Sequence, residues 1–296
     1  MSDMQPAQEK TGAVTRGETI VVARDVVREF GERRALDGLT FEVRRGECLG
    51  LLGPNGAGKT TTLRILSTRL LSTSGHVRVL GLDPARDSAG IRARIGVVPQ
   101  EIALYDALGA RENLDFFARL HGLERGRVRT RVDWALAQAG LEDRAAERVK
   151  TFSGGMKRRL NIVASLLHEP ELVLLDEPTV GLDPQSRHHV FEMVDRLRAA
   201  GVTLVYTTHQ LGEVERLCDR IVVLDHGRTL AQGTLAELAQ TCGLAGRERV
   251  TVGQRSREAA QLLAMHGFAV DVERESVGLE EIFLSLTGRA LRDGES

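Results

Sequence analysis

A glycine-rich stretch constrains the fold of this chain more than any other feature of its sequence. It fits the pattern G-x-x-x-x-G-K-[ST] and consists of Gly53, Pro54, Asn55, Gly56, Ala57, Gly58, Lys59, Thr60 and Thr61. Residues 47–52 before it read as a buried strand, and Leu63, Leu66 and Leu70 after it recur at helical spacing. A strand, a glycine loop and a helix in this order predict a phosphate-binding loop in an α/β fold; an ordinary glycine turn is the alternative.

The residue types in this loop are those that binding a polyphosphate requires. Glycines let successive backbone N–H groups point inward, and the N-terminus of the following helix adds partial positive charge. Lys59 is expected to reach the β- and γ-phosphates, and the Thr60 hydroxyl is expected to hold Mg²⁺. The sequence therefore predicts that the chain binds a nucleoside triphosphate together with Mg²⁺.

The composition is that of a globular protein and argues against several function classes. Of the 296 residues, 42% are hydrophobic and 27% are charged, and the net charge of −1 gives no reason to expect a nucleic-acid partner. No run approaches the roughly 18 apolar residues that span a bilayer. Residues 1–18 are polar, so we expect a flexible tail and no signal peptide. The three cysteines lack metal-ligand spacing and are expected to be reduced thiols, as in cytosol.

The apolar segments outside the glycine loop predict the rest of the sheet structure. Residues 19–47 alternate apolar and polar side chains, so they are expected to form antiparallel strands around a turn. Strand-like runs follow later in the chain, and the apolar ones suit burial on both faces of a mainly parallel sheet: 94–98, 172–175, 202–206 and 220–224. We therefore expect an α/β core of mainly parallel sheet that carries an antiparallel β subdomain.

The periodicity also predicts how the chain divides into domains. Between about 101 and 169 it is helical, and one face collects Val132, Ala135, Leu136 and Ala139. We expect an ATPase domain over 19–235 that contains this helical subdomain, and a small α+β appendage over 236–296. Within the appendage the expected elements are a strand at 250–252, a helix at 257–266, a strand at 268–272 and a closing helix from 278.

Polar residues at the ends of two apolar runs complete a predicted hydrolytic site. Asp176 and Glu177 follow the run 172–175 directly. Asp176 is expected to hold Mg²⁺ through its water shell, and Glu177 to act as the general base on the attacking water. His209 ends the next run, where a residue sensing the γ-phosphate is wanted. Two solvated acids and a surface histidine are the alternatives.

A second predicted anion site lies at Ser153, Gly154 and Gly155. The residues that follow are apolar at i, i+3, i+4 and i+7, so Ser153 is expected to cap the N-terminus of an amphipathic helix. A hydroxyl, two unencumbered N–H groups and a helix dipole suit a phosphate. Taken alone, an ordinary capped helix is the better explanation of this segment.

In combination, these motifs resemble the nucleotide-binding subunit of ATP-binding cassette transporters, over residues from about 20 to 235. The order agrees throughout: the phosphate loop, a Q-loop glutamine at Gln100, the Phe-Ser-Gly-Gly-Met signature over 152–156, the two acids, a D-loop over 181–183 and the switch residue His209. Several independent motifs in one order make the resemblance highly specific.

The resemblance implies partners and further site residues. Two such subunits, identical or different, are expected to close head to tail, with Ser153, Gly154 and Gly155 of each capping the ATP held by the other's Lys59. Gln100 is expected to sense Mg²⁺ and nucleotide. The helical subdomain is expected to dock onto membrane subunits. Phe30 stands where the family has an adenine-stacking aromatic residue, although a core role for it is equally open.

Two departures from the common pattern point to one branch of the family. The signature has Phe152 and Met156 where Leu and Gln are usual, and residues 279–292 resemble the tail of daunorubicin-resistance-like ATPases. That branch serves exporters of drugs, lipids or polysaccharides that have separate ABC-2-type membrane permeases. The resemblance therefore implies an ATPase at the cytoplasmic face of the cell membrane.

Two other functions would also use a nucleotide-binding cassette. A soluble superfamily member acting on ribosomes usually has two cassettes, whereas this chain has one. A DNA-repair relative has a long coiled coil between the two motifs, but Lys59 and Ser153 are only 94 positions apart (153 − 59). A non-hydrolysing nucleotide-binding regulator is disfavoured because Glu177 and His209 are both present.

Overall fold

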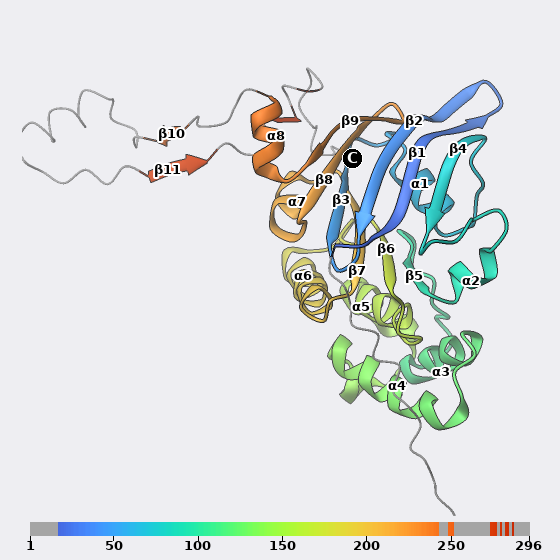
Figure 1. The fold of residues 1–296 in the computed structure, drawn as a ribbon. Coiled ribbons are helices and arrows are strands. Elements are labelled where there is room, and N and C mark those ends of the chain that lie inside the picture. The colour runs from blue at the N-terminus through green and yellow to red at the C-terminus, as the bar shows by residue number, and fades with distance from the viewer. Residues whose placement is uncertain are drawn as a thin grey trace, which may run out of the picture.

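The computed structural model describes residues 17–242, 248–251, 273–276, 279, 282, 283 and 286. These residues form a three-stranded antiparallel sheet, a six-stranded mainly parallel sheet and a two-stranded ribbon. Figure 1 shows β1, β2 and β4 at one end of the molecule, helices α3 and α4 at the other, and the large sheet between them. This architecture confirms the predicted fold class.

The three-stranded sheet has the order β2-β1-β4, with all neighbours antiparallel. Its strands are β1 (Thr19–Phe30), β2 (Arg33–Arg44) and β4 (Ser74–Val79). Alternate residues of β2 such as Leu39, Phe41 and Val43 are buried, because one face of this sheet packs on the core. The antiparallel pair expected over 19–47 is therefore present.

The six-stranded sheet places the chemistry-bearing loops side by side. Its strands, in spatial order, are β5 (Ile95–Val98), β6 (Leu172–Asp176), β7 (Thr203–Thr208), β3 (Cys48–Leu52), β8 (Arg220–Asp225) and β9 (Arg228–Gly233). All pairs are parallel except β8 with β9. Every residue of β3, β6 and β7 is buried. Because these three parallel strands are neighbours, their carboxyl ends meet at one edge, where ligands bind in such sheets.

The helices divide into two groups. Those around the sheets are α1 (Lys59–Leu66), α2 (Ser88–Arg92), α6 (Pro184–Ala199), α7 (Leu211–Leu217) and α8 (Leu235–Thr241). The helical subdomain consists of α3 (Ala110–Leu120), α4 (Arg125–Ala139), α5 (Gly154–Ala164) and the short 3₁₀ turns η1 (Glu142–Arg144) and η2 (Val149–Thr151). The predicted apolar face of α4 is buried in full: Val132, Ala135, Leu136 and Ala139. No helix in the described part of the chain is long and apolar enough to cross a membrane.

The C-terminal region is described only in part. The strands β10 (Glu248–Thr251) and β11 (Glu273–Ser276) pair antiparallel. Three later residues are buried in one apolar cluster with Leu52 of β3 and Val214 of α7: Leu279, Ile282 and Phe283. Part of the predicted appendage therefore packs on the strand that leads into the glycine loop. The helix expected at 257–266 and the strand expected at 268–272 lie outside the described residues, as does most of the expected tail, and the domain boundaries stay predictions.

Candidate active site

The glycine loop connects β3 to α1 and gathers carbonyl oxygens around Lys59. Lys59 is the first residue of α1 and is only 4% exposed. Its Nζ donates hydrogen bonds to the carbonyl oxygens of Gly53 at 2.7 Å and Pro54 at 3.1 Å. Asn55 and Gly56, at the tip of the loop, are exposed. The ammonium group is thus held inside the loop, while the outer N–H groups remain open to a ligand.

Two glycines of the loop are required by its packing. Gly58 has φ +108°, in the left-handed region, and a Cβ there would stand 2.6 Å from Leu36 Cδ2. A Cβ on Gly53 would collide with the Leu224 carbonyl oxygen. Because the neighbours are backbone or buried side chain, neither site admits a larger residue without displacing β2 or β8. The path of the loop is therefore fixed by its close packing against β2 and β8.

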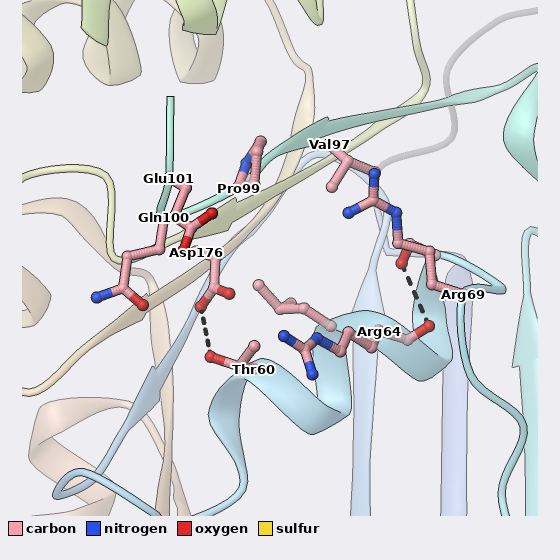
Figure 2. A pocket seen from close by; sticks show the side chains of 10 residues that line it. Thr60, Arg64, Arg69, Val97, Pro99, Gln100, Glu101 and Asp176 are labelled. Carbon is pink, nitrogen blue, oxygen red and sulfur yellow. Dashed lines mark hydrogen bonds between the residues drawn. The ribbon is translucent and has the colours of Figure 1, made fainter. Parts of the chain in front are cut away.

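Asp176 and Thr60 form the polar floor beside this loop. Thr60 Oγ1 donates to Asp176 Oδ1 at 3.1 Å (Figure 2). Thr207 Oγ1 donates to the same oxygen at 3.0 Å. Burial raises the pKa of Asp176, and the two hydroxyl hydrogen bonds oppose that rise. A buried carboxylate that only neutral hydroxyls satisfy gains strongly from a cation at the same spot.

Glu177 lies between Lys59 and His209. Its Oε1 is 3.0 Å from Lys59 Nζ, and its Oε2 is 3.4 Å from His209 Nδ1. The His209 contact meets the ion-pair distance but not hydrogen-bond geometry, since Nδ1 has no hydrogen-bond partner. Glu177 also has φ +43°, a left-handed backbone that costs a non-glycine residue about 1–3 kcal/mol. Backbone strain of this kind is typical of functional sites.

Gln100 borders the same site. A cavity of about 220 Å³ has Thr60, Asp176 and Gln100 in its wall, and Figure 2 shows it beside the first turns of α1. Arg64 and Arg69 also line this cavity. The structure therefore brings the predicted Q-loop glutamine to the predicted metal residues, although they come from three different segments.

Phe30 is at the tip of the β1–β2 hairpin and is 46% exposed, which rules out the core role. The guanidinium of Arg28 lies 4.5 Å from the centre of its ring. On the partner strand β2, Arg33 pairs with Phe30, and its Nη2 is 3.8 Å from the place of a Cβ on Gly56. The exposed ring therefore belongs to the hairpin tip that flanks the glycine loop, where an adenine-stacking residue is expected.

The signature segment is separate from these residues. Ser153 caps α5, because its Oγ accepts a hydrogen bond from the backbone N–H of Met156 at 3.3 Å. Ser153 and Gly154 are exposed, whereas Gly155 is packed so closely on Ser186 that a Cβ would overlap it. None of the described contacts of Lys59 involves the signature. An open cap of this kind suits a ligand brought by another molecule.

The donor set fits Mg²⁺ with a polyphosphate. Mg²⁺ prefers oxygen ligands and is usually bound through one or two carboxylates together with substrate phosphates. Thr60, Asp176 and Gln100 offer a hydroxyl, a carboxylate and an amide oxygen on one cavity. No group of three or more His, Cys, Asp or Glu residues suited to a metal occurs in the described ranges, so phosphate oxygens would complete the coordination.

Three residues that support the site were not predicted. Thr207 of β7 donates to Asp176 and accepts the backbone N–H of Glu177 at 3.0 Å. Glu213 of α7 is buried and accepts hydrogen bonds from the hydroxyls of Thr179, Tyr206 and Thr208. Arg158 of α5 binds the backbone at Gln100. The only sequence signal for Thr207 is that two threonines directly follow the apolar run 202–206.

Comparison with known proteins places this chain in a family. The ABC transporter family model matches residues 36–180. The chain is 39% identical to the linearmycin resistance ATP-binding protein LnrL of Bacillus subtilis (strain 168), over 92% of this chain and 99% of that protein. It is 44% identical to the daunorubicin resistance ATP-binding protein DrrA3 of Streptomyces coeruleorubidus, over 87% and 82%. It is 38% identical to the Nod factor export ATP-binding protein I of Ralstonia nicotianae (strain ATCC BAA-1114 / GMI1000), over 94% and 97%.

The fold comparison agrees. A solved dimeric structure of an ATP-binding cassette in a post-hydrolysis state, bound to ADP and Pi, superposes with a TM-score of 0.66 at 27% identity. The match covers 73% of this chain and 98% of that one. The sequence motifs, the sheet order and the clustered Lys59, Asp176 and Glu177 lead to the same conclusion. The chain belongs to the ATP-binding cassette transporter family and is an ATPase subunit of it.

Proposed function

We propose that this chain hydrolyses ATP in a head-to-tail dimer and thereby drives export of a drug-, lipid- or polysaccharide-like compound through a separate ABC-2-type membrane permease. The observation that carries the catalytic part is the buried contact of Glu177 with both Lys59 and His209. Export is supported by the names of its relatives, two of which are resistance proteins and one a Nod factor exporter. The subunit would work at the cytoplasmic face of the membrane.

Binding is assigned to the loop and its neighbours. The N–H groups of the glycine loop and the Lys59 ammonium would hold the β- and γ-phosphates, and Phe30 would stack on the adenine. Thr60, Asp176 and Gln100 would hold the cation. Bound Mg²⁺ supplies positive charge to the phosphate oxygens. Lys59 would then exchange its contact with Glu177 for a phosphate oxygen.

That exchange frees Glu177 for its chemical role. Glu177 is 7% exposed, and its backbone N–H donates to Thr207 Oγ1, which holds the backbone from which the carboxylate extends. It would take a proton from the water that attacks the γ-phosphate. His209, 3.4 Å from the same carboxylate, would contact the γ-phosphate and keep Glu177 in place.

The dimer supplies the remaining phosphate contacts. Replacing Ser153 with arginine is expected to block hydrolysis and leave ATP affinity of the monomer near wild type, because the exposed cap acts on the partner's nucleotide. ATP titration of the monomer and steady-state turnover test this. Ser88→Arg, at the start of α2, is the matched control. An equal loss of affinity and turnover would place Ser153 in its own subunit's site or in the fold.

The helical subdomain offers a surface for the permease. The rings of Tyr105 and Phe116 meet edge to face, with their centres 4.9 Å apart. Both side chains are at least 40% exposed, and Leu120 is 67% exposed. Beside them is a mainly apolar cavity of about 360 Å³, whose wall includes Phe117 and Leu120. Apolar patches of this kind mark interaction sites. We assign this surface to the membrane subunit because it lies on the subdomain away from the β1–β2–β4 sheet (Figure 1).

Replacing Leu120 with aspartate is expected to abolish binding of the permease, since it places a charge in the apolar contact. ATP turnover of the isolated subunit should stay within about twofold of wild type, because the site residues are untouched. The measurement is co-purification of membrane proteins with tagged protein from gently solubilised membranes in Mg·ATP. Leu230→Asp, on β9, is the control. Recovery of ribosomes, or of a subunit dimer alone, with the wild-type protein would contradict the exporter proposal.

A further inference from the structure

Arg158 joins the signature helix to the Q-loop. It lies on α5, one turn after the Ser153 cap, and is 4% exposed. Its Nη1 donates to the Pro99 carbonyl oxygen at 2.8 Å, and its Nη2 donates to the Gln100 carbonyl oxygen at 2.5 Å. One planar guanidinium thus grips two successive peptide groups just where the chain leaves β5.

The charge of this guanidinium is costly to bury. Within the described ranges no carboxylate pairs with it, and its Nε has no hydrogen-bond partner. Burial lowers the pKa of Arg158, and electrostatic interactions with Tyr206 and Asp176 oppose this shift. A buried charge without a counter-ion usually costs several kcal/mol. What Arg158 provides in return is its pair of hydrogen bonds to the Pro99 and Gln100 carbonyl oxygens, so its role is to hold that backbone segment.

Two further contacts fasten the same segment to the same helix. Asn161 Oδ1 accepts a hydrogen bond from the Ala103 backbone N–H at 3.2 Å. Lys157 Nζ is 2.7 Å from Asp106 Oδ1. Position 161 is a neighbour of both 157 and 158 on the helix surface, because it follows them by four and three residues. The loop after β5 is therefore attached to α5 by side-chain contacts as well as to the sheet by its own strand.

We infer that Arg158 is a positioning residue: it ties the backbone of Gln100 to the signature helix, so that dimer closure on Ser153 and placement of Gln100 at the metal residues occur together. This inference rests on the proposed dimeric ATPase function. α5 begins at the cap that would meet the partner's nucleotide, and Gln100 borders Asp176 in its own subunit. When the dimer closes on Ser153, Arg158 would therefore move the Gln100 backbone of the same subunit together with α5.

The chain contains a matched control for this residue. Arg159 is the next residue of α5, is partly buried, and also donates to a carbonyl oxygen, that of Ala139 at 2.8 Å. Its contact stays inside the helical subdomain, because Ala139 ends α4. Arg158→Met and Arg159→Met therefore remove the same chemistry from the same helix, and only the first detaches the Gln100 loop.

The test is a double-mutant cycle with Gln100→Ala. Arg158→Met is expected to lower turnover by about tenfold and to raise the Mg²⁺ concentration for half-maximal turnover, while monomer ATP affinity is retained. Adding Gln100→Ala to Arg158→Met should cost little more, because both act through one contact. Arg159→Met with Gln100→Ala should instead show additive losses.

A measurement independent of turnover accompanies the cycle. Backbone hydrogen exchange over 101–103 should be faster in Arg158→Met than in wild type or Arg159→Met, because the loop has lost its anchor. If Arg158→Met fails to fold, Arg158→Lys replaces it, since one ammonium lacks the fork that serves both carbonyls. Additive losses, or unchanged exchange, would overturn the inference. If wild-type protein itself neither dimerises with ATP nor hydrolyses it, the proposed function fails instead.

Discussion

Replacing Glu177 with glutamine is expected to reduce ATP turnover by roughly 10²–10⁴-fold, the usual contribution of a general base, while ATP binding is retained. Glutamine has nearly the same shape, keeps the left-handed backbone at this position and still reaches Lys59 and His209. It lacks the negative charge that accepts a proton. Lys59 keeps its hydrogen bonds to the Gly53 and Pro54 carbonyl oxygens, so the loop itself stays organised.

Two measurements check this variant. Phosphate release under steady state gives the loss of turnover, and sizing chromatography with Mg·ATP should show a trapped dimer, because the nucleotides that hold the subunits together are not consumed. Glu42→Gln is the control: it removes a carboxylate of an exposed ion pair with Arg24 on the antiparallel sheet. Turnover within tenfold of wild type would remove Glu177 from the general-base role, and a persistent monomer would count against the nucleotide sandwich.

Much of the fold was predictable because its signals are local. Fully buried parallel strands read as continuous apolar runs, and the runs 172–175 and 220–224 correspond to β6 and β8 within one residue. The 3.6-residue period of α4 is equally local, since its apolar stripe has to face a core. Motifs with strict geometry, such as the glycine loop, predict strand, turn and helix together.

The contacts that complete the site depend on strand order, which no local pattern contains. Thr207 reaches Asp176 only because β6 and β7 are neighbours in the sheet, 31 positions apart in sequence. Arg158 meets Gln100 across 58 positions, and Glu213 becomes a shared acceptor only after α7 packs beside β7. The left-handed backbone of Glu177 is likewise imposed by its surroundings, since its sequence contains no glycine signal there.

Packing of the tail was also beyond the sequence pattern. Residues of the stretch 279–292 resemble a family tail, but nothing in the stretch says which surface it covers. In the structure Leu279, Ile282 and Phe283 join the cluster that includes Leu52, the last residue before the glycine loop. Removing this stretch would therefore expose apolar surface directly behind the phosphate site, which gives the tail a structural connection to ATP binding.

Replacing Lys59 with alanine is expected to abolish ATP turnover and to weaken ATP binding strongly. Lys59 is the only lysine in the glycine loop, all of whose residues the structure describes. Its ammonium contacts the carbonyl oxygens of Gly53 and Pro54 and the carboxylate of Glu177. Without it Glu177 has only the 3.4 Å contact to His209, so a buried carboxylate is left without a firm counter-charge. Such losses cost about 3–5 kcal/mol in buried pairs.

Variants that change stability and turnover differently distinguish a folding defect from a loss of catalysis at Lys59. Lys59→Met retains most of the apolar stem, so comparing it with Lys59→Ala distinguishes a packing defect from loss of charge. Lys59→Ala with Glu177→Gln removes both charges of the pair and is expected to recover thermal stability without recovering turnover, because the phosphate contact is still missing. Lys150→Ala, at an exposed position, is the surface control. Normal hydrolysis in a folded Lys59→Ala protein would show that the glycine loop does not bind the reacting phosphates.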